Sequence, residues 1–356
     1  MSKLELDNYI GCLLGGAIGD ALGAPTEFMS LKGILHKYGN KGVTDYVEFE
    51  DNIGRITDDT QMTLFTAEGL IRYINTEREG GNRGDYIQAV YRSYIEWLNT
   101  QTKAGPGNIN VKHEMEGCLL SNRLIYKKRA AGITCLNALS SGGCGFIDTP
   151  INNSKGCGGV MRVAPVGLVF HNDSSRAFKI GAELAAITHG HPSGFLSAGT
   201  FSAIISCLNQ GQELENAIQT SMIILKEWKH HEETLSAINK AIDLFETTQP
   251  AFENVEKIGE GWTGEEALAI SLYCALHYPN NFEKAIVLSI NHSGDTDSTG
   301  SITGNIIGLL TGRIGMPEDW IMNLEMAETI IQIAQDLHLC NINSEGIPLM
   351  PSCLKP

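Results

Sequence analysis

The sequence is short of basic side chains. It has 26 Lys and Arg against 41 Asp and Glu, which gives a formal net charge of −15. Proteins that bind nucleic acids or acidic membranes without specificity attract phosphate groups with basic patches. This composition therefore argues against a nucleic-acid partner and against a membrane partner. It does not exclude a small anionic ligand, because a bound cation can reverse the local field.

Long apolar runs are missing as well. No uninterrupted apolar stretch approaches the roughly 18 residues that a membrane-spanning helix needs. The opening stretch, MSKLELDN, carries charges where a signal peptide has an apolar core. No Cys-x-x-Cys pair occurs among the nine cysteines, so a zinc site of that kind is not expected. Together these absences predict a cytoplasmic protein without a leader or a membrane anchor.

Alternation of apolar and polar residues, which is typical of half-buried strands, is nearly absent. Apolar residues recur instead at helical spacing, in residues 69–74, 178–187, 201–208, 217–225, 267–276 and 326–337. Residues 43–49 are the best candidate for a short strand or an extended loop. No linker divides the chain, so we predict an all-α fold, a compact single-domain orthogonal helical bundle over residues 1–340. Residues 341–356 contain three prolines and no period, which predicts an irregular tail.

The informative residues lie in two acid-rich segments, each directly before a helical apolar pattern. Their oxygen-bearing side chains are Thr57, Asp58 and Asp59 in the first segment and Asp295, Asp297 and Ser298 in the second. One interpretation is that these residues only cap helix N-termini, where hydroxyls and carboxylates accept unpaired N–H groups. A cap needs one oxygen, however, and each segment offers two carboxylates and a hydroxyl.

The alternative interpretation is a metal site. If the two segments meet in the fold, four carboxylates share a small volume, and their repulsion raises some pKa values unless cations are present. Hard divalent cations bind oxygen ligands of this type, and the set is large enough for two ions. Neither segment contains His or Cys, which argues against zinc.

Two further acids lie in a glycine-rich segment near the N-terminus. The glycines fall three or four residues apart and would form a thin helix face that lets another backbone approach closely; they are Gly15, Gly16, Gly19 and Gly23. We expect Asp20, within this helix, to be a buried structural acid bonded to a neighbouring helix end. Glu27 follows the helix-ending Pro25, and by itself it is typical of a solvated loop acid.

Four motifs together resemble the ADP-ribosylglycohydrolase family. They are residues 16–28 (GAIGDALGAPTEF), 57–60 (TDDT), 156–162 (GCGGVMR) and 294–299 (GDTDST). They occur in the order typical of that family, and the resemblance runs from about residue 7 to residue 313. The family includes the hydrolase that reactivates dinitrogen reductase and the ADP-ribosyl-arginine hydrolases of animals.

The resemblance implies a compact all-α fold with a binuclear Mg²⁺ or Mn²⁺ centre. Carried over by position, the metal ligands are Thr57, Asp58, Asp59, Asp295, Asp297 and Ser298. Many members of the family have Thr in place of Ser298, and Thr299 is an alternative hydroxyl ligand. Glu27 and Asp59 become the catalytic candidates, because either could polarise the water that attacks the anomeric carbon of the ribose. Which of the two acts as the general base stays open.

The resemblance also gives meaning to the glycine-rich loop at 156–159. Its candidate substrate-binding residues are Gly156, Cys157, Gly158, Gly159 and Met161. Backbone N–H groups of such a loop can surround a diphosphate, as they do in anion-binding nests. The alternative is a packing turn that leads into a helix.

Two more side chains are candidates for substrate binding. His191 lies in a segment that is similar to one near the family's active site, although a lone histidine is more often a hydrogen-bonded structural residue. Trp262 offers a face on which a nucleotide or an acceptor can stack. The following Glu265 and Glu266 add negative charge, or they only favour a helix N-terminus.

The expected reaction is hydrolysis that removes ADP-ribose from a modified protein, with arginine as the preferred acceptor. That preference rests on the resemblance and on the acidic, aromatic surroundings expected at Trp262, which would suit a planar cation. Serine-linked or O-acetyl-linked ADP-ribose is the alternative substrate. A different class of function is an immunity protein that binds and neutralises a cognate ADP-ribosyltransferase toxin.

Overall fold

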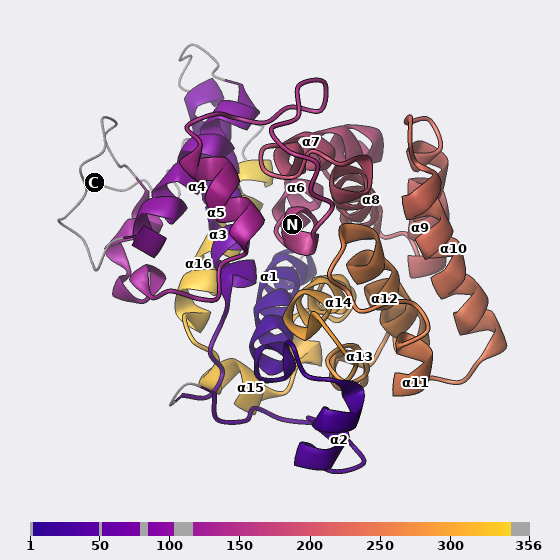
Figure 1. Ribbon diagram of the computed structural model, residues 1–356. Helices are drawn as coiled ribbons and strands as arrows, with labels where there is room; N and C mark the ends of the chain where they lie inside the picture. Colours follow the sequence, from indigo (N-terminus) through magenta and orange to yellow (C-terminus); the bar gives the residue numbers. More distant parts are fainter. Residues whose placement is uncertain (1–2, 50–51, 79–84, 103–116, 343–356) are drawn as a thin grey trace.

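The computed structural model describes residues 3–49, 52–78, 85–102 and 117–342 (Figure 1). Within these ranges the chain forms sixteen α-helices and a few short 3₁₀ turns, and no extended strand. The only pairing of strand type among the described residues is at two isolated bridges, Phe49 with Asn52 and Gly156 with Thr263. The predicted all-α fold is therefore confirmed.

The helices follow one another with short connections. Their bounds are α1 Lys3–Gly23, α2 Leu31–Tyr38, α3 Asp58–Arg78, α4 Tyr86–Thr102, α5 Ile133–Ser140, α6 Ala164–Val169, α7 Ser174–Ala186, α8 Pro192–Asn209, α9 Leu214–Leu225, α10 Glu232–Thr247, α11 Phe252–Val255, α12 Gly264–His277, α13 Phe282–Ser289, α14 Thr296–Thr311, α15 Glu318–Asn323 and α16 Ala327–Ile342.

All six segments predicted from apolar spacing lie in helices, with a one-residue overrun at the end of α7 and at the start of α16. Residues 43–49 form a loop that ends at the Phe49 bridge, so the extended-loop alternative is confirmed. The domain boundary proposed at residue 340 falls inside α16, whose last residue is Ile342. Residues 343–356 of the predicted tail lie outside the described residues.

Helices α1 and α14 lie side by side at the centre of the fold, although they come from opposite ends of the chain (Figure 1). The glycine stripe of α1 makes this contact possible. A Cβ atom built at Gly19 would lie 2.0 Å from the carbonyl oxygen of Gly300, and one built at Gly304 would lie 1.9 Å from that of Gly15. Only glycine fits at such a distance, so the thin helix face predicted from the sequence is confirmed.

The other helices surround this central pair and bury one large apolar core. Helix α16 returns to pack on α1 and α3, whereas α12 and α13 cover the other side of α14. No described helix combines the length and the apolar character that a membrane span requires. The central pair brings the first turn of α14 next to Gly23, at the C-terminal end of α1, close to the start of α3.

Candidate active site

Asp20 holds the beginning of α3 against α1. Its carboxylate is fully buried and accepts hydrogen bonds from the backbone N–H groups of Thr57, at 3.0 and 3.1 Å, and Thr60, at 3.2 Å. The Thr60 hydroxyl donates to the same carboxylate. These are the unpaired donors of a helix N-terminus, so Asp20 caps α3 from a neighbouring helix. The structural role predicted for Asp20 is confirmed.

The first acid segment forms the first turn of α3. The Thr57 hydroxyl accepts a hydrogen bond from the Asp59 N–H at 3.2 Å, as an N-cap residue does. Asp58 is held by a separate loop, because its N–H donates to the carbonyl of Arg129 at 3.1 Å and its carboxylate accepts from the Gly132 N–H at 3.3 Å. Capping therefore occurs, but it leaves carboxylate oxygens of Asp58 and Asp59 for other contacts.

The second acid segment forms the first turn of α14 and meets the first. Asp295 is the N-cap residue and accepts from the Ser298 N–H at 3.2 Å. The Ser298 hydroxyl donates to Oδ1 of Asp59 at 2.8 Å, across 239 residues of sequence. The hydroxyl of Thr299 instead donates to the backbone carbonyls of Ser289 and Asp295. Of the two hydroxyls considered from the sequence, only that of Ser298 is bonded to a carboxylate of the first acid segment.

The acids of the two segments are buried together. Asp58, Asp59, Asp295 and Asp297 are each 3–6% exposed. Burial, followed by repulsion from Asp297, raises the pKa of Asp58 to about 7 and raises the pKa values of Asp59 and Asp295 well above the ordinary range. We call these four carboxylates the acid cluster. It cannot be fully ionised at neutral pH without a compensating positive charge.

Glu27 lies at the edge of the acid cluster. It is only half-buried, unlike the four aspartates. Burial and then the negative charges of Asp297, Asp295 and Asp58 raise its pKa to about 10. Glu27, which by itself is typical of a solvated loop acid, thus lies beside the acid cluster and still contacts solvent.

The acid cluster, together with the hydroxyls of Thr57 and Ser298, fits hard divalent cations, because these cations prefer oxygen ligands and would compensate the negative charge of the carboxylates. Among the described residues, however, no three His, Cys, Asp or Glu side chains converge in a ready metal-binding arrangement. The carboxylates bond to protein donors instead: Asp59 to Ser298, and Asp295 to the thiol of Cys157 at 2.7 Å.

The glycine-rich loop at 156–159 adjoins the cluster through Cys157. Gly156 pairs with Thr263, and the Cys157 N–H donates to the carbonyl of Trp262 at 3.1 Å. The Gly156 N–H donates to the Ser154 hydroxyl at 3.3 Å. These two N–H groups are therefore used within the protein, which leaves Gly158 and Gly159 as the loop residues that a diphosphate-binding nest would depend on.

Met161 places the end of this motif against the cluster. Its side chain is buried, and its sulfur lies 3.9 Å from the Ser298 hydroxyl. Its carbonyl accepts from the hydroxyl of Thr63 in α3 at 3.3 Å. Met161 thus packs between the two acid segments.

The histidine that supports the loop is His189. A Cβ atom built at Gly158 would lie 3.0 Å from the His189 ring, so the loop packs directly on it. Burial and the charge of Arg162 lower the His189 pKa to about 3, which keeps the ring neutral. His191, the residue chosen from the sequence, is the N-cap of α8 and accepts from the Ser193 N–H at 3.2 Å. The sequence of the segment does not indicate which of the two histidines, His189 or His191, packs against the glycine-rich loop.

Trp262 stacks on Phe28, the residue after Glu27, with 5.0 Å between ring centroids. Phe28 is 73% exposed and has φ 66°, a strained conformation for a non-glycine residue. The Trp262 indole N–H donates to the exposed carboxylate of Glu260 at 3.1 Å. Sequence reasoning missed Phe28, although an aromatic residue directly after a candidate catalytic acid was a usable signal.

The acidic rim expected after Trp262 needs a correction. Glu265 is only 4% exposed and binds Lys155 at 2.8 Å, so it does not face an acceptor. Glu266 accepts a hydrogen bond from the Glu260 N–H at 3.3 Å. The exposed negative charge next to Trp262 belongs to Glu260.

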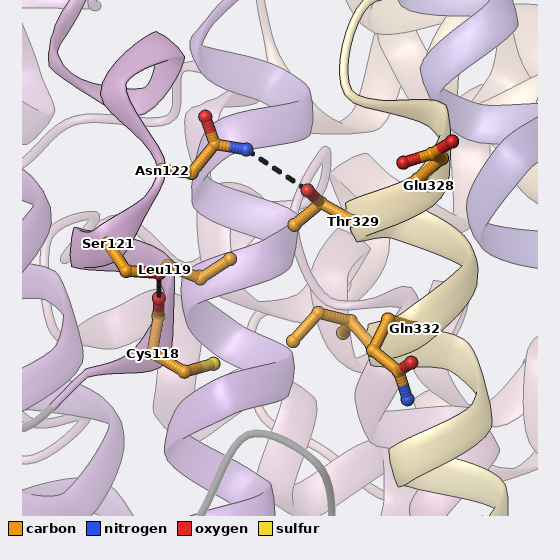
Figure 2. Close-up of a pocket in the computed structure, with 8 residues that line it drawn as sticks. Cys118, Leu119, Ser121, Asn122, Glu328, Thr329 and Gln332 are labelled. Carbon is orange, nitrogen blue, oxygen red and sulfur yellow. Dashed lines mark hydrogen bonds between the residues drawn. The ribbon is translucent and has the colours of Figure 1, made fainter.

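A surface cavity of about 520 Å³ lies elsewhere, between α16 and the turn at 118–122 (Figure 2). Asn122 donates to the hydroxyl of Thr329 across it at 3.0 Å. Its one carboxylate is that of Glu328, and it contains no residue of the acid cluster. The chemistry of the acid cluster, rather than cavity volume, therefore identifies the candidate site.

Comparisons with known proteins show the family to which the chain belongs. A family model described as ADP-ribosylglycohydrolase matches residues 1–345. An ADP-ribosylarginine hydrolase, Tri1, of Pseudomonas putida is 24% identical over 336 residues, which cover 93% of this chain and 78% of the relative. The ADP-ribosyl-[dinitrogen reductase] glycohydrolase of Rhodospirillum rubrum is 24% identical, with 90% and 91% covered.

A solved structure described as an ADP-ribosylglycohydrolase-related protein complex has the same fold. Its TM-score is 0.65 at 19% identity, and the match covers 96% of this chain and 100% of that one. With the family match over almost the whole chain, the protein belongs to the ADP-ribosylglycohydrolase family. It is accordingly a glycohydrolase enzyme that acts on ADP-ribose linkages.

Proposed function

We propose that this enzyme removes ADP-ribose from arginine side chains of modified proteins, with two Mg²⁺ or Mn²⁺ ions held at the acid cluster. The observation that carries the site is the hydrogen bond from Ser298 to Asp59, which joins the two acid segments. The residues that would hold the ions are Thr57, Asp58, Asp59, Asp295, Asp297 and Ser298. When bound, the ions would neutralise the clustered carboxylates and orient the ribose hydroxyls.

The chain's own groups would carry the proton transfer. Without the ions Glu27 holds its proton, because burial and the neighbouring carboxylates raise its pKa to about 10. Bound ions would compensate those negative charges, so Glu27, the acid of the site in contact with solvent, would be ionised and placed to accept a proton from the attacking water. The oxygen of that water bonds to the anomeric carbon as the bond from this carbon to the guanidinium nitrogen breaks. A proton passes to the leaving nitrogen, which gives free ADP-ribose and unmodified arginine. The buried carboxylates stabilise the positive charge that develops on the sugar.

Arginine as the acceptor is supported by two observations. A relative of similar sequence is named an ADP-ribosylarginine hydrolase. The stacked rings of Phe28 and Trp262, with the Glu260 carboxylate beside them, offer a face that attracts a planar cation. Serine-linked ADP-ribose lacks that cation and would gain nothing from the stacked pair.

A competition assay tests the acceptor. Equal amounts of arginine-linked and serine-linked ADP-ribosyl peptides are mixed with the enzyme and Mg²⁺, and the ADP-ribose released from each is followed. We expect faster release from arginine by about tenfold or more, the size of a partly desolvated cation–π contact. Phe28→Leu, which keeps bulk without a π face, should reduce this preference, and Phe28→Tyr should retain it. Faster release from serine would reject arginine and leave the hydrolase assignment standing.

A further inference from the structure

The loop that covers Asp58 is fixed by a residue far away in the sequence. Asp58 contacts this loop twice, through the carbonyl of Arg129 and the N–H of Gly132. Nη2 of Arg129 lies 2.5 and 2.6 Å from the two carboxylate oxygens of Glu325, 196 residues later. The ion pair therefore joins the Asp58 loop to the connection between α15 and α16.

This ion pair is buried. The side chain of Arg129 is 2% exposed and that of Glu325 is 5% exposed. The pair of Arg313 with Glu318 is far more open, with 39% and 61% of the two side chains exposed. Burying two charges carries a large desolvation cost, and apolar side chains of similar volume often stabilise a fold as well. A contribution to the stability of the fold is therefore not enough to explain an ion pair at this buried position.

The backbone on both sides of the pair is held in an unfavourable conformation. Ala130 has φ 59° and Met326 has φ 62°, and each directly follows one partner of the pair. Among the described residues only four non-glycine positions have positive φ. Such conformations persist where the surroundings over-determine them, and they gather at functional sites.

Glu325 also holds the segment that leads into the first metal-ligand candidates. Its N–H donates to the carbonyl of Gly54 at 2.9 Å, three residues before Thr57. Glu325 thus contacts the chain before Asp58 through its backbone and the loop over Asp58 through its carboxylate. One residue fixes two segments that meet at Asp58.

We infer that the Arg129–Glu325 pair is a positioning device for Asp58. By fixing the Arg129 carbonyl and the Gly132 N–H, the pair holds the Asp58 carboxylate toward the rest of the acid cluster. Neither residue belongs to the candidate ligands or to the catalytic candidates, so the role inferred for the pair is positioning. This inference rests on the proposed function in one respect: it takes the acid cluster to be the metal site. Groups that orient metal ligands in this way typically change metal affinity by about 10–100-fold when removed.

The test replaces both charges together. Arg129→Met with Glu325→Leu exchanges the ion pair for apolar side chains and leaves no unpaired buried charge. The matched control is Arg313→Gln with Glu318→Gln, which removes an exposed pair. Three quantities are measured on each full-length protein: the melting temperature without metal, amide hydrogen exchange of residues 56–62, and the dissociation constant for Mn²⁺.

We expect the Arg129/Glu325 double variant to melt within a few degrees of the parent, to exchange faster at the start of α3 and to bind Mn²⁺ about tenfold more weakly. The control should change none of these quantities. Unchanged exchange and unchanged Mn²⁺ affinity in the folded variant would overturn the inference. If the double variant does not fold, Arg129→Lys, which keeps the charge and loses the two-oxygen contact, is judged by the same measurements.

Failure of the proposed function would look different. A parent protein that binds no Mn²⁺ would reject the metal site itself. Hydrogen exchange without metal would still decide whether the Arg129–Glu325 pair fixes Asp58, because this measurement needs no bound ion.

Discussion

The hydroxyl of Ser298 donates to the carboxylate of Asp59, and through this one bond the first turns of α14 and α3 become a single site. Each turn also satisfies its own helix N-terminus, with Thr57 and Asp295 as the capping groups. Capping and clustering are thus not competing explanations. The caps orient the two turns, and the remaining carboxylate oxygens form the acid cluster.

The pH dependence of stability should reverse when metal is added. Without metal, the folded-state pKa of Asp58 and of Asp20 is about 7, raised from 3.8. The folded protein then holds protons that the unfolded chain releases, so this stability is present below the ordinary pKa and is lost as the pH rises through about 7. In EDTA the protein should melt at a lower temperature at about pH 8 than at about pH 5, because at least two carboxyl groups act in this direction and the single imidazole of His189 acts against them. With Mg²⁺ the order should invert, because ligands bind metal in their ionised form.

Thermal melts at the two pH values, with EDTA and with Mg²⁺, measure this directly. Activity after exhaustive chelation is the companion measurement. Full turnover without divalent cations, or the same pH profile in both conditions, would reject the metal site.

Two buried aspartates of the same region should respond differently to truncation. Asp295→Ala removes a candidate ligand and also the N-cap of α14, but the Ser298 N–H keeps Asp297 as an acceptor and the repulsion between Asp295 and Asp297 disappears. We therefore expect turnover to fall by about two orders of magnitude or more while the melting temperature in EDTA changes little. Asp20→Ala leaves the N–H groups of Thr57 and Thr60 without an acceptor, which should lower the free energy of unfolding by about 2–4 kcal/mol.

Kinetics and denaturant titrations on the same preparations separate the two effects. Asp20→Asn, which keeps an acceptor oxygen, is the matched control and should recover part of the lost stability. Near-normal turnover of Asp295→Ala would mean that the second acid segment takes no part in the reaction.

His189 should make the protein sensitive to acid. Its folded-state pKa is lowered from 6.5 to about 3, by burial first and by the charge of Arg162 second. Between these values the unfolded chain takes up a proton that the folded protein refuses, so stability falls as the pH drops below about 6.5. His189→Gln should remove a slope of up to about 1.4 kcal/mol per pH unit from that range.

The measurement is urea unfolding of the parent and of His189→Gln across this pH range, compared as a difference so that the carboxylates cancel. His36→Gln, at an exposed position of α2, is the control substitution. If His189→Gln and the parent lost stability in parallel, the neutral buried histidine would be rejected.

Much of the fold was predictable because local chemistry determines it. Apolar spacing indicated six helices, and the glycines of α1 indicated a close helix contact. The position of Asp20 within that glycine-rich helix predicted an acid bonded to a neighbouring helix end. In each case the residue type restricts the structure whatever the distant partner is.

The parts that were missed depend on distant partners. Of the two alternatives for Glu265 and Glu266, the helix start is confirmed, because both lie in the first turn of α12. The acidic rim is wrong for Glu265, because the fold brings Lys155, 110 residues away, to pair with it. The sequence singled out His191 as a binding candidate, and only the fold shows that the ring packed against the glycine-rich loop is that of His189. The Arg129–Glu325 pair leaves no local pattern at either residue.

The glycine contacts between α1 and α14 fix the register of the two helices. Gly11, Gly15 and Gly19 face Gly308, Gly304 and Gly300 in turn. A slip of one residue along the axis moves a helix by about 1.5 Å and would drive side chains into these carbonyls. Asp20 of α1 caps α3, which carries Asp58 and Asp59, and Asp295 caps α14. The backbone contact between α1 and α14 therefore fixes the distance between the two acid segments. Because this contact consists of glycine backbone, no side-chain rotamer change can alter the distance between the two acid segments.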